Sequence, residues 1–251
     1  MDNFDFERAK KQFQPPASLQ LIKHRQETKS SEIIGIIKDD LLSRKINKAL
    51  SIGASYCLIE SEIKTKLLPD VEFHCTDFDK GALESFDQPA LIKKFISATE
   101  LEFPEENFDF IMAHQVLEHI NDYPVVLKSI EKFCRPKGII YINVPNPFSP
   151  FIVAKKADGT FDRPFIKRFF VNNFKKFKKD FMSNTEKYHT GFTYKTLRKH
   201  FPESTYQVVD KRRTRLKQEF SSSFLKSLVD FIPSILLFLI VPTNIWILIK
   251  K

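Results

Sequence analysis

A glycine turn and an acidic residue beyond it offer groups that could bind a ligand. Residues 48–52 are largely apolar and lead into Gly53, where a tight turn would bring backbone N–H groups close to a bound molecule. Asp77 ends the next apolar run, 24 residues after Gly53, and a ribose-binding acid is expected roughly 20 residues after such a turn. The spacing favours a nucleotide-containing ligand, held by Gly53 and by Asp77 or Asp79. The alternative is an ordinary strand-to-helix turn, with both acids capping the next helix.

Three further side chains are candidates for a role in the site. Glu118 and His119 follow an apolar run that ends at His114 and Gln115, and they start the next helix, where a polar pair could shape the substrate side. His189 lies in a later loop and is the candidate general base of the second half of the chain. The alternatives are a solvated helix start for the Glu-His pair and a structural role for His189.

The elements that must position these groups alternate between strand and helix. Strands are expected at residues 48–54, 71–79, 108–116 and 139–145, and one within 90–99; helices are expected at 30–45, where a Ser caps the start, at 59–70, and at 117–138, which Gly138 ends. This alternation predicts a Rossmann-like, doubly wound α/β fold. Any ligand would lie at the carboxyl ends of its mainly parallel strands.

After Pro147 the pattern changes. Residues 148–192 are rich in Phe and Lys and contain no clear strand. Beyond them we expect a helix at 193–201, a strand at 204–213, a short helix at 234–241 and a strand at 245–249. The last two strands would pair antiparallel at the sheet edge, with a helical insertion between them.

The composition limits the classes of partner and site. A net charge of +9 favours a phosphorylated substrate, an anionic membrane or nucleic acid, or reflects only a Lys-rich composition. Cys57, Cys75 and Cys134 are far apart, which indicates neither disulfides nor a metal site and fits a reducing cytoplasm. The basic run at 211–217 has no nucleic-acid recognition motif around it, so nucleic acid is not expected. An NAD site is disfavoured because G-x-G-x-x-G is missing.

Residues 48–147 resemble the core of class I S-adenosylmethionine-dependent methyltransferases, in particular ubiquinone-biosynthesis-type relatives. Four segments carry the resemblance in order: LSIGASYC, FHCTDFD, ISATELEFPEENFDFIMAHQVLEHI and LKSIEKFCRPKGIIYINVPNP. The first departs from the family's acidic residue and Gly-x-Gly-x-Gly, because Ser51 stands at the acidic position and Ser55 and Cys57 at the second and third glycines. A later segment, EKYHTGFTYKTLRKHF, is similar to one in lipid-precursor and sugar methyltransferases.

The resemblance implies a seven-stranded mixed sheet and S-adenosylmethionine as cofactor. It implies one methyltransferase domain at 31–251 after an N-terminal helical extension at 1–30, with a cofactor-binding core at 48–147, a helical insertion or lid at 148–192, and a C-terminal helix and edge strands at 193–251. The catalytic candidates are Glu118, His119 and His189. The cofactor-binding candidates are Gly53, Ala54, Ser55, Asp77, Phe78, Ser97, Ala98, His114 and Gln115, with Ser97 and Ala98 beside adenine.

The expected reaction is methylation of a small-molecule, lipid or glycan intermediate, most simply at oxygen. The alternative is a non-catalytic binding protein of the same fold, because the glycine loop is degenerate. We expect a cytoplasmic protein that touches the inner membrane surface without spanning it. The Phe/Lys-rich run at 164–182 and the proline-bounded apolar segment at 236–241 would form the contact face. In the alternative, both segments fold over the cleft.

Overall fold

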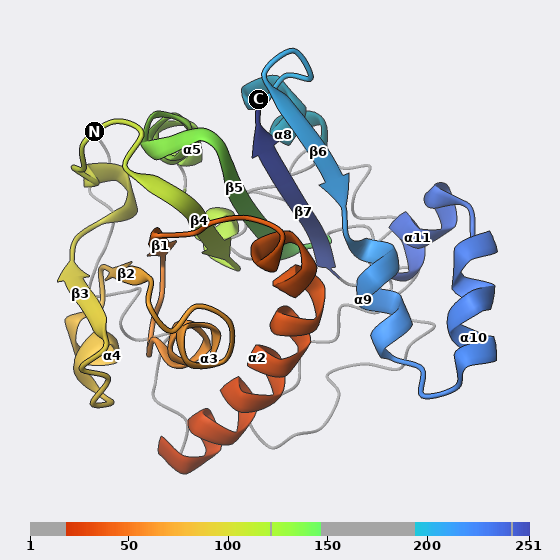
Figure 1. Cartoon of the computed structure of the whole chain (residues 1–251), viewed down its shortest axis with the longest axis horizontal. Coiled ribbons are helices and arrows are strands. Elements are labelled where there is room, and N and C mark those ends of the chain that lie inside the picture. The colour runs from red at the N-terminus through yellow and green to blue at the C-terminus, as the bar shows by residue number, and fades with distance from the viewer. Residues whose placement is uncertain (1–18, 121, 147–193, 242) are drawn as a thin grey trace, which may run out of the picture.

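A central mixed sheet organises the chain. The structure, a computed structural model, describes residues 19–120, 122–146, 194–241 and 243–251 (Figure 1). Its seven strands run in the order β3-β2-β1-β4-β5-β7-β6. They are β1 (Lys48–Ile52), β2 (Glu72–Asp77), β3 (Leu91–Phe95), β4 (Phe108–His114), β5 (Cys134–Pro145), β6 (Tyr206–Asp210) and β7 (Thr243–Lys250). The first five pair in parallel, and β7 pairs antiparallel with both β5 and β6. The predicted seven-stranded mixed sheet is confirmed.

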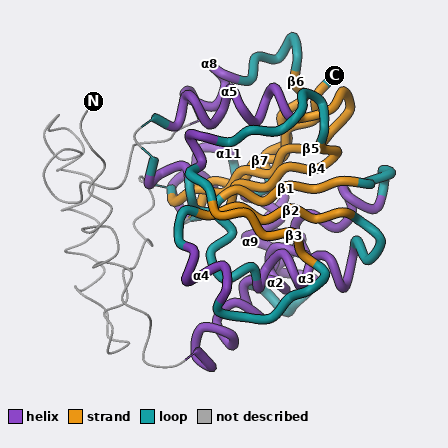
Figure 2. Tube along the Cα trace, turned by 90° about the vertical axis from the view of Figure 1, so that its left-hand side faces the viewer, coloured by secondary structure: helices purple, strands orange, loops and turns teal. Residues whose placement is uncertain are grey.

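Helices cover both faces of this sheet, as the edge-on view in Figure 2 shows. The α-helices of the described residues are α2 (Leu19–Leu42), α3 (Leu58–Leu67), α4 (Lys80–Glu84), α5 (Tyr123–Phe133), α8 (Tyr194–His200), α9 (Arg212–Gln218), α10 (Ser223–Leu228) and α11 (Ser234–Ile240). Short 3₁₀ turns are η1 (Ala98–Glu100), η2 (Leu117–His119) and η3 (Val229–Phe231). Apolar residues of α2 and α3 form one core with the sheet, and those of α5 and α8 form the other.

The two cores follow from alternation along the central strands. In β4, Phe110 and Met112 point into the core beneath α2 and α3, while Ile111 and Ala113 point into the core beneath α5. Because both faces are covered, the strand reads as a continuous apolar run instead of an apolar–polar alternation. His114 ends this run on the α2 face, at the carboxyl edge of the sheet.

The predicted start of the first helix is wrong. The helix α2 begins at Leu19, and Ser30 and Ser31 lie inside it, so neither caps its start. Ser31 is accommodated there because its hydroxyl donates to the Glu27 carbonyl, 3.2 Å away and one turn earlier. The helix crosses residues 30 and 31 without a break. The division into an extension and a domain at that point stays a prediction.

The predicted helix at 117–138 and its glycine stop are also wrong. The chain forms η2 and then α5, which has a proline in its first turn and ends at Phe133. Gly138 lies within β5, where the register shifts so that Cys134 faces Phe108 and Ile139 faces Phe110. A Cβ on Gly138 would lie 2.8 Å from the Cys134 sulfur. This glycine therefore permits an irregular strand and does not end a helix.

The C-terminal elements agree with the sequence. The strands β6 and β7 are antiparallel, with α9, α10, η3 and α11 between them, although β7 lies inside the sheet and β6 forms its edge. Among the described residues, no helix is both long enough and apolar enough to cross a membrane. The predicted Phe/Lys-rich insertion lies outside the described residues.

Candidate active site

The loop after β1 keeps the backbone of a glycine-rich turn although it holds one glycine. Gly53, Ser55 and Cys57 all adopt positive φ angles, of 70°, 48° and 55°. These are alternate positions, the same ones at which the resemblance expects glycines. The N–H groups of Gly53 and Ala54 both donate to the Thr76 carbonyl, at 2.8 and 2.9 Å, which fixes the loop to the end of β2. The substitutions therefore change side chains while the left-handed conformation remains.

Gly53 has a second reason to be glycine. A Cβ built at this position would lie 2.4 Å from a methyl carbon of Val116, in the segment between β4 and η2. The loop and the end of β4 therefore approach each other more closely than any side chain at position 53 would allow. This brings the first and fourth strands together at the carboxyl edge of the sheet.

Asp77 and Asp79 have different roles. One carboxylate oxygen of Asp77 accepts from the Ser55 N–H at 2.7 Å and the other accepts from the Asp79 N–H at 2.9 Å. Asp79 instead caps α4 by accepting from the Ala82 N–H at 3.0 Å. Burial raises the pKa of Asp77 above its ordinary value. Asp77 thus faces the glycine loop, and capping explains only Asp79.

A buried glutamate lies beneath the same loop. The Ser51 hydroxyl donates to Glu60 Oε1 at 2.6 Å, and both residues are almost fully buried. Glu60 is in the first turn of α3, where an acidic side chain favours the helix N-terminus. Burial raises the pKa of its carboxyl to about 7. An acidic group therefore lies near the end of β1 although residue 51 is a serine.

The turn after β3 is joined to the Asp77 region. The Ile96 N–H donates to the Asp77 carbonyl at 3.0 Å. The next residue, Ser97, caps η1 through its hydroxyl, which accepts from the Thr99 N–H at 3.4 Å. Ala98 packs against the core beneath α5. Ser97 and Ala98 thus lie at the same edge of the sheet as the glycine loop.

Three polar side chains form a row where β4 and β5 end. His114 is opposite Asn143 in the strand register. The Asn143 amide nitrogen donates to the Tyr141 hydroxyl oxygen at 3.1 Å, and that oxygen lies 3.3 Å from His114 Nδ1. Burial is the main cause, and the nearby Lys29 ammonium a second, of a His114 pKa of about 3. His114 is therefore a neutral imidazole at physiological pH.

Glu118 and His119 are adjacent in η2. Glu118 Oε1 lies 3.8 Å from His119 Nε2, and the glutamate is buried while the histidine is partly exposed. Burial raises the pKa of Glu118 to about 7. A carboxyl group that titrates near neutrality is suited to accept a proton from an acceptor molecule. Among the described residues, no cluster of His, Cys, Asp and Glu side chains is suited to hold a metal ion.

A family model described as a methyltransferase domain matches residues 42–225. The chain belongs to this methyltransferase family. No curated protein matches the chain.

Solved structures of methyltransferases share its fold. The plantazolicin methyltransferase BpumL, in complex with a monoazolic desmethylPZN analog and SAH, has a TM-score of 0.58 and 11% identity over 92% of this chain and 88% of its own. A putative S-adenosylmethionine-dependent methyltransferase from Listeria monocytogenes has a TM-score of 0.54 and 11% identity over 89% and 98%. One from Archaeoglobus fulgidus has a TM-score of 0.52 and 15% identity over 93% and 95%. The fold of S-adenosylmethionine-dependent methyltransferases, and with it the resemblance found in the sequence, is confirmed.

The methyltransferase gathers most of the expected site residues at one edge of its sheet. The glycine loop, Asp77, the Ser97–Ala98 turn, the end of β4 and η2 all follow the carboxyl ends of parallel strands. Phe78 follows Asp77 directly and is half-buried. His189 lies outside the described residues, so its role as a base stays a prediction.

Sequence reasoning missed Glu60 and the row of Tyr141 and Asn143. A signal for the row was present, because Tyr141 and Asn143 are polar residues two apart in an otherwise apolar strand and therefore share a face. The sequence gave no comparable signal that Glu60 is buried, since an acidic residue in a first helical turn is normally exposed. Its burial depends on Ser51, which lies on a different element.

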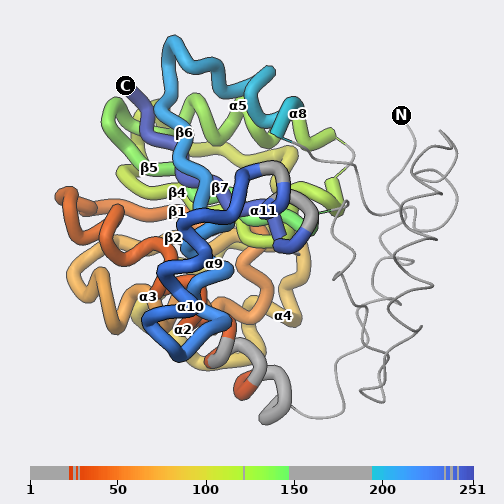
Figure 3. Tube along the Cα trace, turned by 90° about the vertical axis from the view of Figure 1, so that its right-hand side faces the viewer, coloured from red at the N-terminus to blue at the C-terminus, as the bar shows by residue number. Residues whose placement is uncertain are grey.

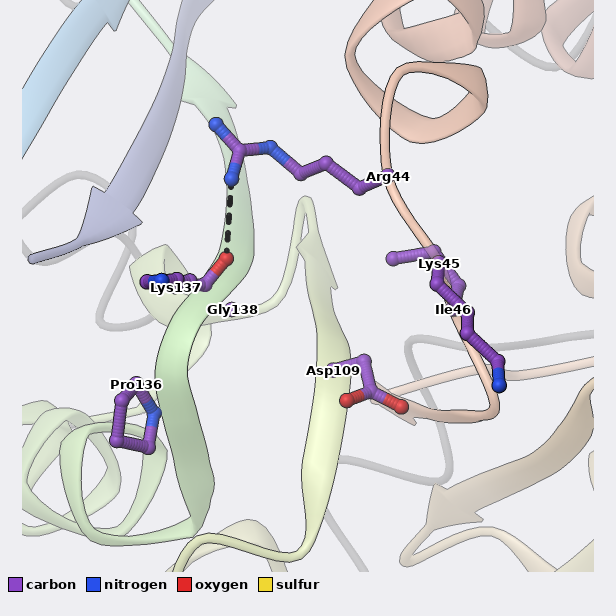
Figure 4. Close-up of a pocket in the computed structure, with 7 residues that line it drawn as sticks. All are labelled: Arg44, Lys45, Ile46, Asp109, Pro136, Lys137 and Gly138. Atoms are coloured by element: carbon purple, nitrogen blue, oxygen red, sulfur yellow. Dashed lines mark hydrogen bonds between the residues drawn. The ribbon is translucent and has the colours of Figure 1, made fainter.

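A cavity of the methyltransferase lies at the opposite edge of the sheet. It has a volume of about 280 Å³ and is lined by Arg44, Lys45, Ile46, Asp109, Pro136, Lys137 and Gly138 (Figure 4). Arg44 reaches across it to donate to the Lys137 carbonyl at 3.3 Å. Asp109 is occupied by the Arg135 guanidinium, at 3.0 Å, and by two backbone N–H groups. This cavity lies by the amino ends of β4 and β1, away from the glycine loop.

Proposed function

We propose that this methyltransferase uses S-adenosylmethionine to methylate a hydroxyl group of a small-molecule, lipid or glycan acceptor in the cytoplasm. The observation that carries the proposal is the loop at 53–57, whose left-handed backbone faces the buried Asp77 carboxylate. Glycine-like backbone at alternate positions is costly for Ser55 and Cys57, and strain of this kind persists where a ligand site requires it. A non-catalytic binding protein of the same fold is the competing proposal.

The residues present fit the cofactor. The Asp77 carboxylate accepts the backbone N–H groups of Ser55, Phe78 and Asp79, and its capacity of about four hydrogen bonds leaves room for a ribose hydroxyl. Ser97 and Ala98 would border the base, and Gly53 to Ser55 would border the amino-acid part. When bound, the cofactor supplies an electrophilic methyl group, so the protein has to align the acceptor and remove its proton.

Glu118 is the side chain best suited to remove that proton. With a pKa of about 7, about half of its carboxyl groups are ionised near neutral pH, so the group is both available and basic enough. A hydroxyl acceptor needs such a base, which is why we propose O-methylation. His119 lies beside Glu118 and would stabilise its ionised form when protonated.

Calorimetric titration with S-adenosylhomocysteine tests the cofactor proposal. We expect binding to the wild-type protein and a loss of at least about tenfold in affinity for Asp77→Asn, because the neutral amide cannot accept as strongly. Asp79→Ala is the matched control, since this residue caps α4 and should lower stability more than affinity. No detectable binding at millimolar ligand would contradict the proposal. Binding without any methyl transfer to cell extracts would favour the non-catalytic alternative.

We propose in addition that the protein contacts an anionic membrane at its cytoplasmic face. Five large apolar side chains on α10, η3 and α11 are exposed: Phe224, Leu225, Leu228, Phe231 and Leu236. These elements lie together on the side of the molecule that Figure 3 faces. Within the segment at 236–241, Leu236 is exposed while Leu237 and Val241 are buried, so most of the exposed apolar side chains precede this segment in the sequence. Release of the protein from cell membranes by a high-salt wash would support this, and full recovery in the soluble fraction at low salt would refute it.

A further inference from the structure

A second cavity lies directly beside the candidate active site. It has a volume of about 140 Å³ and is enclosed by α2, the ends of β4 and β5, α9 and the start of β7. Its polar floor consists of His114, Asn143 and Thr243. The helix α9, which covers it, is held to α2 by an ion pair between Glu32 and Arg215, and by Gln218, which donates to the Glu32 carbonyl at 3.1 Å. The cavity is therefore built by elements from both halves of the sequence.

Three polar atoms of this floor have no hydrogen-bond partner among the described residues. They are His114 Nε2, Asn143 Oδ1 and Thr243 Oγ1, and all three atoms are buried. Asn143 as a whole is only 2% exposed. Buried polar groups are nearly always paired, so an unpaired set around one cavity needs an explanation. A ligand that supplies the missing partners explains all three atoms.

The hydrogen bonds beneath the floor decide what each atom offers. Asn143 donates to the Tyr141 oxygen, so the Tyr141 hydroxyl hydrogen needs an acceptor of its own. Among the described residues, His114 Nδ1 at 3.3 Å is the acceptor in reach. The neutral imidazole therefore carries its hydrogen on Nε2, facing the cavity. The floor presents one donor, His114 Nε2–H, beside one acceptor, Asn143 Oδ1, and a hydroxyl group pairs with both.

The charges around the cavity favour an anionic group at its rim. Arg215 is occupied by Glu32 and Glu219. Lys29 is exposed on α2 and has no hydrogen bond or ion pair with any described residue, yet it lines the cavity. The acidic groups near the rim, Glu32 and Glu219, are both paired with the same arginine. The Lys29 ammonium group, whose charge also acts on Glu32, is thus the cation that a negatively charged ligand would meet at the rim.

We propose that this cavity binds the methyl acceptor and that the acceptor is a small hydroxylated anion, which rests on the proposed function. A hydroxyl group pairs with His114 and Asn143 at the floor, and a carboxylate or phosphate lies near Lys29 at the rim. Thr243 contributes a second polar contact. His114 acts as a positioning residue here.

Saturation-transfer NMR with four probe molecules, in the presence of saturating S-adenosylhomocysteine, tests the proposal. Glycerol 3-phosphate and lactate each carry hydroxyl and anionic groups, and they distinguish a phosphate from a carboxylate site. Glycerol lacks the anion and propyl phosphate lacks the free hydroxyls. We expect at least one of the hydroxylated anions to bind about tenfold more tightly than glycerol and propyl phosphate. Equal binding of all four molecules, or binding of none of them, would overturn the proposal.

Two variants assign the binding to this cavity. Thr243→Val removes one hydroxyl at nearly constant shape and Lys29→Gln removes the charge, and each should weaken the preferred probe about five- to tenfold. Lys38→Gln, an exposed lysine on the same helix that does not line the cavity, is the matched control and should change nothing. Unchanged probe affinity in both cavity variants would place the site elsewhere. If the probes bind but S-adenosylhomocysteine does not, the cavity is still a binding site, and the proposed function is contradicted.

Discussion

Ser55 adopts a left-handed backbone conformation that an L side chain disfavours by about 1–2 kcal/mol. Replacing it with glycine removes this strain but costs about 0.5–1 kcal/mol through the freer unfolded chain. We therefore expect Ser55→Gly to raise the free energy of unfolding by about 0.5–1 kcal/mol in urea titrations, with cofactor affinity preserved. A decrease in stability would mean that the Ser55 side chain contributes more than its backbone costs.

Gly53→Ala provides the opposite test in the same loop. The new methyl group would overlap Val116 and would occupy a residue with φ of 70°. We expect a loss of about 2–4 kcal/mol in unfolding free energy, together with weaker binding of S-adenosylhomocysteine. Stability within 1 kcal/mol of the wild-type value would show that Val116 yields easily.

The buried carboxyl group of Glu60, beneath the glycine loop, should make the free energy of unfolding depend on pH. Because folding raises its pKa from 4.5 to about 7, the ionised form is disfavoured in the folded state. Its contribution to stability is complete below pH 4.5 and is lost as the pH rises through 7, by roughly 3 kcal/mol. Glu60→Gln should therefore flatten the decline in unfolding free energy between pH 5 and pH 8. Glu62→Gln, on the same helix but partly exposed, is the control and should leave the decline unchanged.

At the scale of the element, the position of α9 depends on its contacts with α2. Lys211 and Asp40 form an ion pair at 2.7 Å, and both side chains are 16% exposed. Such a desolvated pair should show a coupling energy of about 1–2 kcal/mol in a double-mutant cycle of unfolding. The exposed pair of Lys80 and Glu84, at 3.7 Å, should show at most about 0.5 kcal/mol. Equal coupling in the two pairs would mean that α9 is not held in this way.

Elements were easier to predict than the contacts between them. Each central strand was visible as an apolar run bounded by a turn, because a strand buried on both faces leaves that pattern in the sequence. The pair Ser30 and Ser31 misled the prediction for α2, since a serine inside a helix, such as Ser31, which bonds back to the preceding turn, looks the same in sequence as one that caps. Gly138 misled it for α5, since only the shifted register of β4 and β5 shows which element needs the glycine.

The residues of the candidate site also differ in whether the sequence could predict them. Gly53 and Asp77 could be predicted because a turn and an acid at strand ends are local features with a known spacing. The floor of the second cavity could not, because it joins residues of β4, β5 and β7 that are up to 129 positions apart in the sequence. Only the order of strands in the sheet, with β5 between β4 and β7, brings Thr243 and His114 to the same cavity.

At the scale of the whole molecule, five of the ten large apolar side chains that are exposed among the described residues lie on three consecutive elements, α10, η3 and α11. Phe231 is 83% exposed and Phe224 is 67% exposed, and both lie in the segment of α10 and η3. Lys226 lies between them in the sequence, and the chain carries a net charge of +9. Aromatic side chains with basic neighbours suit the interface of an anionic membrane, because the rings enter the headgroup region while the charges attract the lipids.

This arrangement predicts that membrane binding has separable apolar and electrostatic parts. Each phenylalanine that enters the interface should contribute about 1.5–3 kcal/mol. Phe224→Ser with Phe231→Ser should therefore weaken sedimentation with vesicles of phosphatidylcholine and phosphatidylserine by more than about tenfold, at low and high salt alike. Lys226→Gln should weaken it only at low salt, because salt screens the attraction. Binding that survives the double phenylalanine substitution would place the contact on another surface, and equal binding to vesicles of phosphatidylcholine alone would remove the role of charge.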